Sequence, residues 1–117
     1  MAFRFRPAAP RDRAAVFAFC AHTWPDGDYI PHVWDAWLAD RTGLLVVGVD
    51  ATDTPVAVGK LTVVAPGEGW LEGLRVAPTL RRQGWGRALT AHLTACAWAR
   101  GLHVVRWLTA ARNTPMH

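Results

Sequence analysis

The most informative run of this sequence is Gly73-Leu-Arg-Val-Ala-Pro-Thr-Leu-Arg-Arg-Gln-Gly-Trp-Gly-Arg-Ala-Leu89. The residues from Leu71 to Val76 alternate as in a β-strand, and Pro78 ends the strand because proline has no backbone N–H to donate. From Ala88 onward, apolar residues recur at helical spacing. They end at Gly101, and a glycine in the left-handed conformation is typical of the C-terminus of an α-helix. The run therefore predicts a strand, a basic loop and a helix in that order.

The loop between this strand and this helix has the composition of a phosphate-binding site. It consists of Arg81, Arg82, Gln83, Gly84, Trp85, Gly86 and Arg87. The first amides of a helix lack intrahelical partners and, together with the helix dipole, attract anions. Glycines let an anion approach the backbone closely, and three arginines around one loop suit a compact polyphosphate.

The motif Arg81-x-x-Gly84-x-Gly86, preceded by Leu74-Arg-Val-Ala-Pro, resembles the acetyl-CoA-binding motif of the GCN5-related N-acetyltransferases, the GNAT family. A Rossmann fingerprint also begins with G-x-G, but here Leu89 occupies the place of the third glycine and the unit comes after several strands. A purely structural turn is the alternative reading of the motif.

The resemblance implies acetyl-CoA as the cosubstrate. The amides of residues 83–87 and the arginines before them would hold the pyrophosphate, and the backbone of residues 74–76 would bind the pantetheine arm and the developing oxyanion. Asn113 resembles the residue that opens the next helix of the family and helps to hold CoA. The cofactor-binding residues expected on this basis are Leu74, Arg75, Val76, Arg81, Arg82, Gln83, Gly84, Trp85, Gly86, Arg87 and Asn113.

The rest of the chain predicts a mixed α/β fold with the order β-α-α-β-β-β-α-β, which is the order of the resembled family. Strands are expected at residues 3–6, 44–49, 56–64, 70–76 and 103–109. Helices are expected from Pro10 to near His22, from near Pro31, and after the basic loop. The three middle strands should form an antiparallel meander, and the last strand should run parallel to the one before the loop.

At 117 residues the chain is expected to be one domain that is shorter than a complete member of the family. The final helix and two strands of the family have no counterpart in residues 1–117, so the domain is expected to be partial. The strand at residues 103–109 would then be an open sheet edge, which predicts association into a homodimer.

Charge and hydropathy narrow the class of protein. No apolar run approaches a membrane span and no signal-peptide core is present, so a cytoplasmic protein without membrane contact is expected.

Residues 1–72 carry six Lys+Arg against nine acids, net −3, whereas residues 73–117 carry seven Arg and no acid, net +7. A basic second part could bind nucleic acid, but the clustering of its arginines at one loop favours a polyphosphate ligand.

Glu72 is the expected general base. In the resembled family the acceptor amine attacks the thioester directly, and a base removes a proton from the ammonium group. Strict alternation would place Glu72 on the same strand face as Leu74 and Val76. A structural ion pair with an arginine is the alternative role. The general acid is not identified, because the family commonly uses a tyrosine after the fifth strand and Tyr29 is the chain's only tyrosine.

Asp28 and Tyr29 are the expected acceptor-binding residues, in an acidic and aromatic segment of residues 23–40. Carboxylates and aromatic rings suit a cationic amine. Residues 28–38 with residues 72–78 resemble the histidine N-acetyltransferase-like branch, which implies a small amine or amino acid as the acceptor. The alternative is that the aspartates are solvated and the tryptophans pack on the sheet.

The sequence thus predicts an N-acetyltransferase, or its N-terminal part, that transfers an acetyl group from acetyl-CoA to a primary amine. A catalytically silent CoA-binding or assembly module is the second reading. A nucleic-acid-binding protein is the third.

Overall fold

The computed structural model describes residues 3–21 and 27–107. A five-stranded sheet has the order β1-β2-β3-β4-β5, in which β1 to β4 are antiparallel neighbours and β4 and β5 are parallel. The strands are β1 (Arg4–Pro7), β2 (Leu44–Val49), β3 (Pro55–Ala65), β4 (Glu68–Val76) and β5 (Val104–Trp107). The helices are η1 (Pro10–Asp12), α1 (Arg13–Cys20), α2 (Ile30–Ala39), η2 (Pro78–Leu80) and α3 (Trp85–Ala99).

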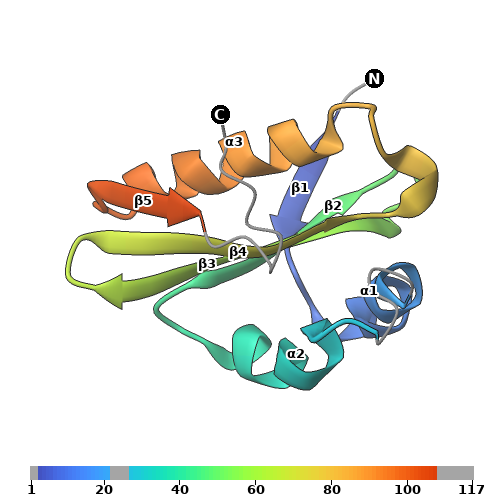
Figure 1. Ribbon diagram of the computed structural model, residues 1–117, viewed down its shortest axis with the longest axis horizontal. Coiled ribbons are helices and arrows are strands. Elements are labelled where there is room, and N and C mark those ends of the chain that lie inside the picture. The colour runs from blue at the N-terminus through green and yellow to red at the C-terminus, as the bar shows by residue number, and fades with distance from the viewer. Residues whose placement is uncertain (1–2, 22–26, 108–117) are drawn as a thin grey trace.

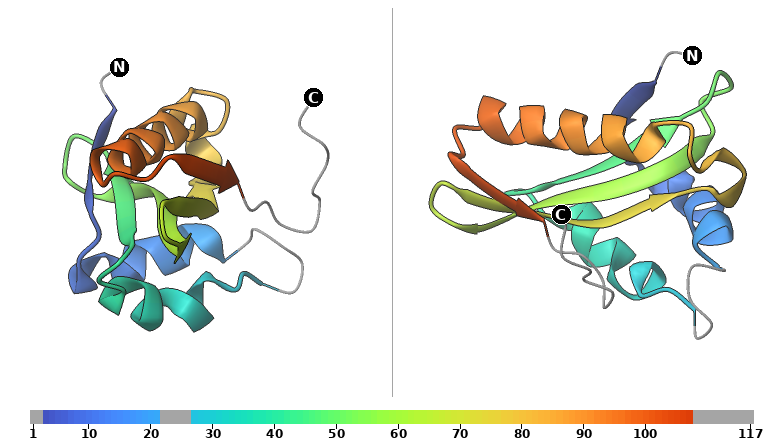
Figure 2. Two further views of the ribbon diagram at one scale, coloured as in Figure 1. Left: turned by 90° about the vertical axis from the view of Figure 1, so that its left-hand side faces the viewer. Right: turned by 45° about the horizontal axis from the view of Figure 1, so that its top comes forward.

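The helices cover both faces of the sheet. Figure 1 places α3 on one face and α1 and α2 on the other. The two views of Figure 2 keep the same arrangement, with β5 beside α3. Each face has its own hydrophobic core, so the molecule has three layers around a central sheet.

The alternation of side chains along β2 explains why both faces are apolar. Val46 belongs to the core under α3, whereas Leu45, Val47 and Val49 belong to the core under α1 and α2. Successive side chains of a strand point to opposite faces, so a strand covered on both sides reads as an uninterrupted apolar run.

The predicted fold class and element order are confirmed, as are the antiparallel meander of β2 to β4 and the parallel pairing of β5. The boundaries differ in places. The structure begins α3 at Trp85 rather than at Ala88, because Gly84 is the N-cap and Gly86 does not interrupt the first helical turn. The last strand is observed at Val104–Trp107, and residues 108 and 109 lie outside the described residues.

The C-terminal end of α3 is formed as predicted. Gly101 has a φ of 83° and directly follows the C-cap. Its amide donates to the carbonyl of Trp98, and the amide of Leu102 donates to that of Ala97. These two bonds are those of a Schellman motif, which satisfies the last helical carbonyls and turns the chain back toward β5.

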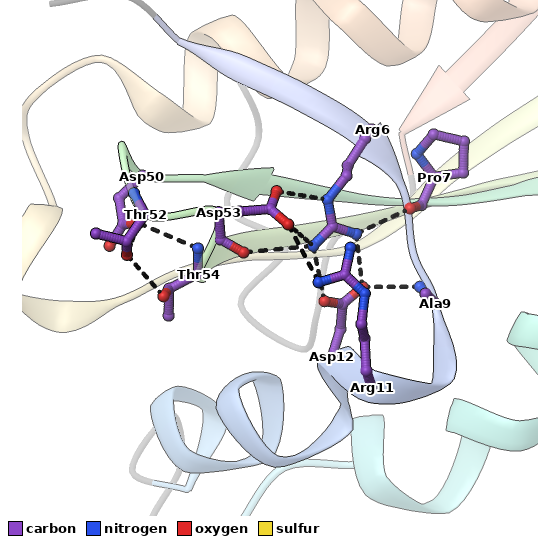
Figure 3. Close-up of polar contacts among 9 residues, drawn as sticks. All are labelled: Arg6, Pro7, Ala9, Arg11, Asp12, Asp50, Thr52, Asp53 and Thr54. Carbon is purple, nitrogen blue, oxygen red and sulfur yellow. Dashed lines mark hydrogen bonds and ion pairs between the residues drawn. The ribbon is translucent and has the colours of Figure 1, made fainter.

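Arg6 joins the edge strand β1 to two other segments (Figure 3). Its guanidinium donates two hydrogen bonds to Asp12, at 2.8 and 2.9 Å, and a third of 2.9 Å to Asp53 in the turn between β2 and β3. Arg11 also pairs with Asp53, at 3.1 Å. Because each partner comes from a different element, the network fixes where β1 ends and where η1 begins.

In the part of the chain that the structure describes, no helix combines the length and the apolar character needed to cross a bilayer.

Candidate active site

A β-bulge in β4 shapes the centre of the site. Val58 lies opposite Arg75 and Lys60 lies opposite Glu72, so Gly73 and Leu74 together face the single residue Gly59. Gly73 has a φ of 66°, in the left-handed region that glycine adopts readily. A Cβ at Gly73 would also lie 2.6 Å from the ring of Trp37. Both observations explain why glycine occupies the bulge.

The bulge inverts the alternation that the sequence predicts. Glu72 lies opposite Lys60, whose ammonium group faces Trp37 of α2. Leu74 and Val76 instead pack against the core under α3. The expectation that Glu72 shares a face with Leu74 and Val76 is therefore wrong, because one extra residue shifts the period-2 pattern. The isolated glycine within the strand was the available signal for a bulge.

Pairing between β4 and β5 runs from Glu68 with Val104 to Leu71 with Trp107 in the described part of the chain. The carbonyl of Leu74 accepts a hydrogen bond of 3.1 Å from the side chain of Arg75. The stretch from Glu72 to Val76 pairs with β3, and Trp107, the partner of Leu71, is the last described residue of β5.

The loop after β4 exposes the amides at the start of α3. Arg82 and Gly84 have left-handed φ values of 66° and 93°, and Gly84 is the helix N-cap, with no side chain to satisfy the first amides. Arg81, Arg82, Gln83, Gly84, Gly86 and Arg87 are all exposed. The exposed arginines and the open helix N-terminus form one basic surface that attracts anions. We call this surface the loop site.

Trp85 is the buried member of the loop site. The residue is 3% exposed, and its ring contacts Phe3 and Phe5 edge to face, at centroid distances of 4.8 and 5.9 Å. The indole therefore anchors the start of α3 on Phe5 of β1 and, beside Gly48, on β2.

Glu72 is held by a hydroxyl group from the neighbouring strand. The Oγ1 of Thr62 lies 2.6 Å from the Oε2 of Glu72 and 2.9 Å from the Nζ of Lys60. The side chain of Lys60 is 1% exposed and pairs with Asp40 at 2.6 Å. Glu72 forms no ion pair with an arginine of residues 3–21 or 27–107.

Lys60 and Thr62 are site residues that the sequence reasoning missed. Lys60 is the only lysine of the chain and stands in an apolar strand, which is the signal that could have found it. Its hydrogen bond, followed by those from Thr42, holds the pKa of Asp40 well below its usual value. Hydrogen bonds thus join the side chains of Asp40, Lys60, Thr62 and Glu72 in that order.

Asp28 does not face the solvent. Its side chain is 1% exposed, and its carboxylate pairs with Arg75 at 2.8 Å and accepts a hydrogen bond of 3.1 Å from the amide of Ile30 at the start of α2. Asp28 therefore links α2 to the bulged part of β4. Direct contact of this carboxylate with a ligand would require the pair with Arg75 to open.

Tyr29 is the exposed aromatic side chain of this region, with 40% of its surface accessible. The guanidinium of Arg75 lies 5.3 Å from the centre of its ring, and Trp37 meets it edge to face at 6.0 Å. Burial of the phenol raises the pKa of Tyr29. Tyr29 and Trp37 thus lie on the same side of the sheet as Glu72.

Asn113 lies outside the described residues. Among the residues described, no cluster of His, Cys, Asp and Glu could hold a metal ion.

Three comparisons place this geometry among known proteins. The model of the family described as "Acetyltransferase (GNAT) family" matches residues 11–117. A search of curated proteins finds no match.

Solved structures have the same fold. A transcriptional regulator from Bacillus halodurans C-125 is 18% identical with a TM-score of 0.78, and the match covers 96% of this chain and 85% of that one. The ribosomal-protein-S18-alanine N-acetyltransferase from Escherichia coli is 22% identical with a TM-score of 0.76, and the match covers 96% of this chain and 70% of that one. An aminoglycoside 6'-N-acetyltransferase complexed with coenzyme A is 19% identical with a TM-score of 0.72, and the match covers 84% of this chain and 57% of that one.

Proposed function

The chain belongs to the GNAT acetyltransferase family, and from this premise we propose that it transfers an acetyl group from acetyl-CoA to the primary amine of a small molecule. The observation that carries the proposal is the loop site at the end of β4, on the same strand as Glu72. The loop site follows the end of β4, and Glu72 lies in the last part of the same strand, so a cofactor bound at the loop would extend along β4 toward the candidate base.

The phosphates of CoA would bind the loop site. The first amides of α3 have no intrahelical acceptor, and Arg81, Arg82 and Arg87 supply positive charge around them. The backbone of residues 74–76, at the bulged end of β4, would pair with the pantetheine arm. A solved structure with the same fold holds coenzyme A, which supports this cofactor.

The chemistry requires two proton transfers and one exchange of bonds. The amine nitrogen attacks the carbonyl carbon of the thioester, a C–N bond forms and the C–S bond breaks. Glu72 accepts one proton of the ammonium group, and the second ends on the sulfur of CoA, which leaves as the thiol. Backbone amides of the bulged strand would stabilise the oxyanion of the tetrahedral intermediate.

The acceptor amine would approach from the side of α2. Glu72 carries negative charge there, and the exposed ring of Tyr29 offers a π face to a cation. Asp28 contributes indirectly, because it fixes Arg75 beneath Tyr29. This arrangement favours a small cationic amine over an anionic acceptor.

A binding titration and a transfer assay test the proposal. Isothermal titration of acetyl-CoA should give 1:1 binding, and the chain should acetylate at least one amine among L-histidine, spermidine and kanamycin. Glu72→Gln should retain acetyl-CoA binding and lower kcat by about 100-fold, the usual effect of a general base.

The outcomes separate the rival functions. Binding of acetyl-CoA without transfer to any amine would favour a silent CoA-binding module. Binding to duplex DNA with a steep salt dependence, and none to acetyl-CoA, would favour a nucleic-acid binder.

A further inference from the structure

We propose that Thr62 is a positioning residue for Glu72, and that the buried Lys60 sets the direction in which the Thr62 hydroxyl donates its hydrogen. The inference rests on the proposed role of Glu72 as the general base. It concerns two residues of β3 that no cofactor or acceptor would need to touch.

The ammonium group of Lys60 has three hydrogens and three acceptors. They are Oδ2 of Asp40 at 2.6 Å, Oγ1 of Thr62 at 2.9 Å and the carbonyl oxygen of Leu61 at 3.2 Å. An ammonium group can only donate hydrogen bonds. With a side chain that is 1% exposed, Lys60 is held in place by these three partners.

The direction of the next hydrogen bond follows from the first. Oγ1 of Thr62 accepts from Lys60, so its single hydrogen remains for the other neighbour, Oε2 of Glu72, at 2.6 Å. A hydroxyl that could rotate freely would sometimes offer a lone pair to the carboxylate. Here the lysine removes that option, and Thr62 always presents a donor to Glu72.

This donor orients the carboxylate of Glu72. It binds one oxygen and so fixes the side-chain rotamer, which leaves Oε1 of Glu72 directed away from Thr62 for a substrate proton. Thr62 and Lys60 therefore prepare Glu72 before any substrate binds.

The first test needs no acceptor. Crystal structures of Thr62→Val and Thr62→Ser should be compared with that of the wild type. Valine has the shape of threonine without the hydroxyl, so Glu72 should leave its position or occupy more than one rotamer. Serine keeps the hydroxyl and should keep Glu72 in place. An unchanged Glu72 in Thr62→Val would overturn the proposal.

The second test is a kinetic double-mutant cycle with acetyl-CoA and the best acceptor among L-histidine, spermidine and kanamycin. Thr62→Val should lower kcat roughly tenfold, the size expected for one hydrogen bond to a charged group, with KM for acetyl-CoA changed by less than about twofold. Thr62→Ser should recover most of the loss. In the Glu72→Gln background, Thr62→Val should cause no further loss.

Thr94→Val is the matched control, because the Thr94 hydroxyl donates to the carbonyl of Thr90 within α3 and to no other described residue. It should leave kcat unchanged. If Glu72→Gln lowers kcat but Thr62→Val costs the same factor in both backgrounds, the positioning role is wrong and the base survives. If Glu72→Gln has no effect, or no acceptor is acetylated, the proposed function fails at this site, and the crystal structures still decide whether Thr62 positions Glu72.

Discussion

Gly86, in the first turn of α3, has open space around it: a Cβ there would have no neighbouring atom within 4 Å. Replacing this helical glycine by alanine should stabilise the fold by about 0.5 kcal/mol, because alanine loses less backbone entropy. If the CoA pyrophosphate lies against this backbone, the added methyl should weaken acetyl-CoA binding roughly tenfold. Thermal unfolding and calorimetry measure the two effects, and unchanged affinity would move the cofactor away from the helix N-terminus.

Gly73 and Gly101 both have a left-handed φ, at 66° and 83°, but only Gly73 is crowded. A Cβ at Gly73 would lie 2.6 Å from the ring of Trp37, whereas one at Gly101 would meet nothing within 4 Å. Gly101→Ala should therefore cost about 1 to 2 kcal/mol from backbone strain alone. Gly73→Ala should cost more, about 3 kcal/mol, because Trp37 must also move. Equal losses in urea unfolding would show that the bulge is not packed against α2.

At the scale of elements, the pair of Asp28 and Arg75 holds the start of α2 against β4. Asp28→Asn removes the charge partner of an arginine whose side chain is 11% exposed, and should lower the free energy of unfolding by about 2 kcal/mol. Asp35→Asn, at an exposed position of the same helix, is the control and should change it by less than about 0.5 kcal/mol. If both variants unfold at the same urea concentration, the pair does not join the two elements.

Asp28→Asn also tests whether α2 helps to bind the acceptor amine. If α2 positions Tyr29 for a cationic amine, Asp28→Asn should raise KM for that amine and leave acetyl-CoA binding unchanged. Identical steady-state kinetics would remove Asp28 from the acceptor site and leave it as a structural contact.

At the scale of the whole molecule, buried and bonded carboxylates should make stability depend on acid pH. Burial raises the pKa of Asp12, but the hydrogen bonds from Arg6 and from the amide of Ala9 more than reverse this, so that pKa lies below its usual value. The pKa of Asp40 is also lowered, first by its hydrogen bond with Lys60. A lowered pKa in the folded state contributes stability that is present above about pH 4 and is lost as pH falls further.

Thermal unfolding between about pH 2 and pH 7 checks this expectation. The melting temperature should be steady near neutral pH and fall below about pH 4. Asp40→Asn should flatten part of that fall, because the variant has no carboxyl group to protonate at this position. A melting temperature that rises with acid would contradict the sign of the argument.

Association of the chain stays a prediction. Among the described residues β5 is the last strand of the sheet, and Trp107 on it is 56% exposed. An open strand edge with an apolar side chain favours pairing with a second copy. Sedimentation over a concentration series should show a dimer, and a monomer at all concentrations would show that this edge is covered.

The sequence by itself determined the order of the elements and the place of the loop site. Period-2 runs, helical spacing, Pro78 and Gly101 are local signals, since each acts on neighbouring backbone. They placed β2 to β4, α3 and the basic loop at positions that the structure confirms.

Only the tertiary structure decided which way the side chains of the site point. The bulge at Gly73 turns Glu72 away from Leu74, and its extra residue is defined by pairing with β3 rather than by β4 alone. Likewise, Asp28 is expected from the sequence to bind the acceptor, but its side chain is buried and paired with Arg75. Thr62 gains its role from Lys60 and Glu72 across two strands. Such contacts join residues far apart in the chain, so no local pattern encodes them, and strand pairing and burial alone bring them together.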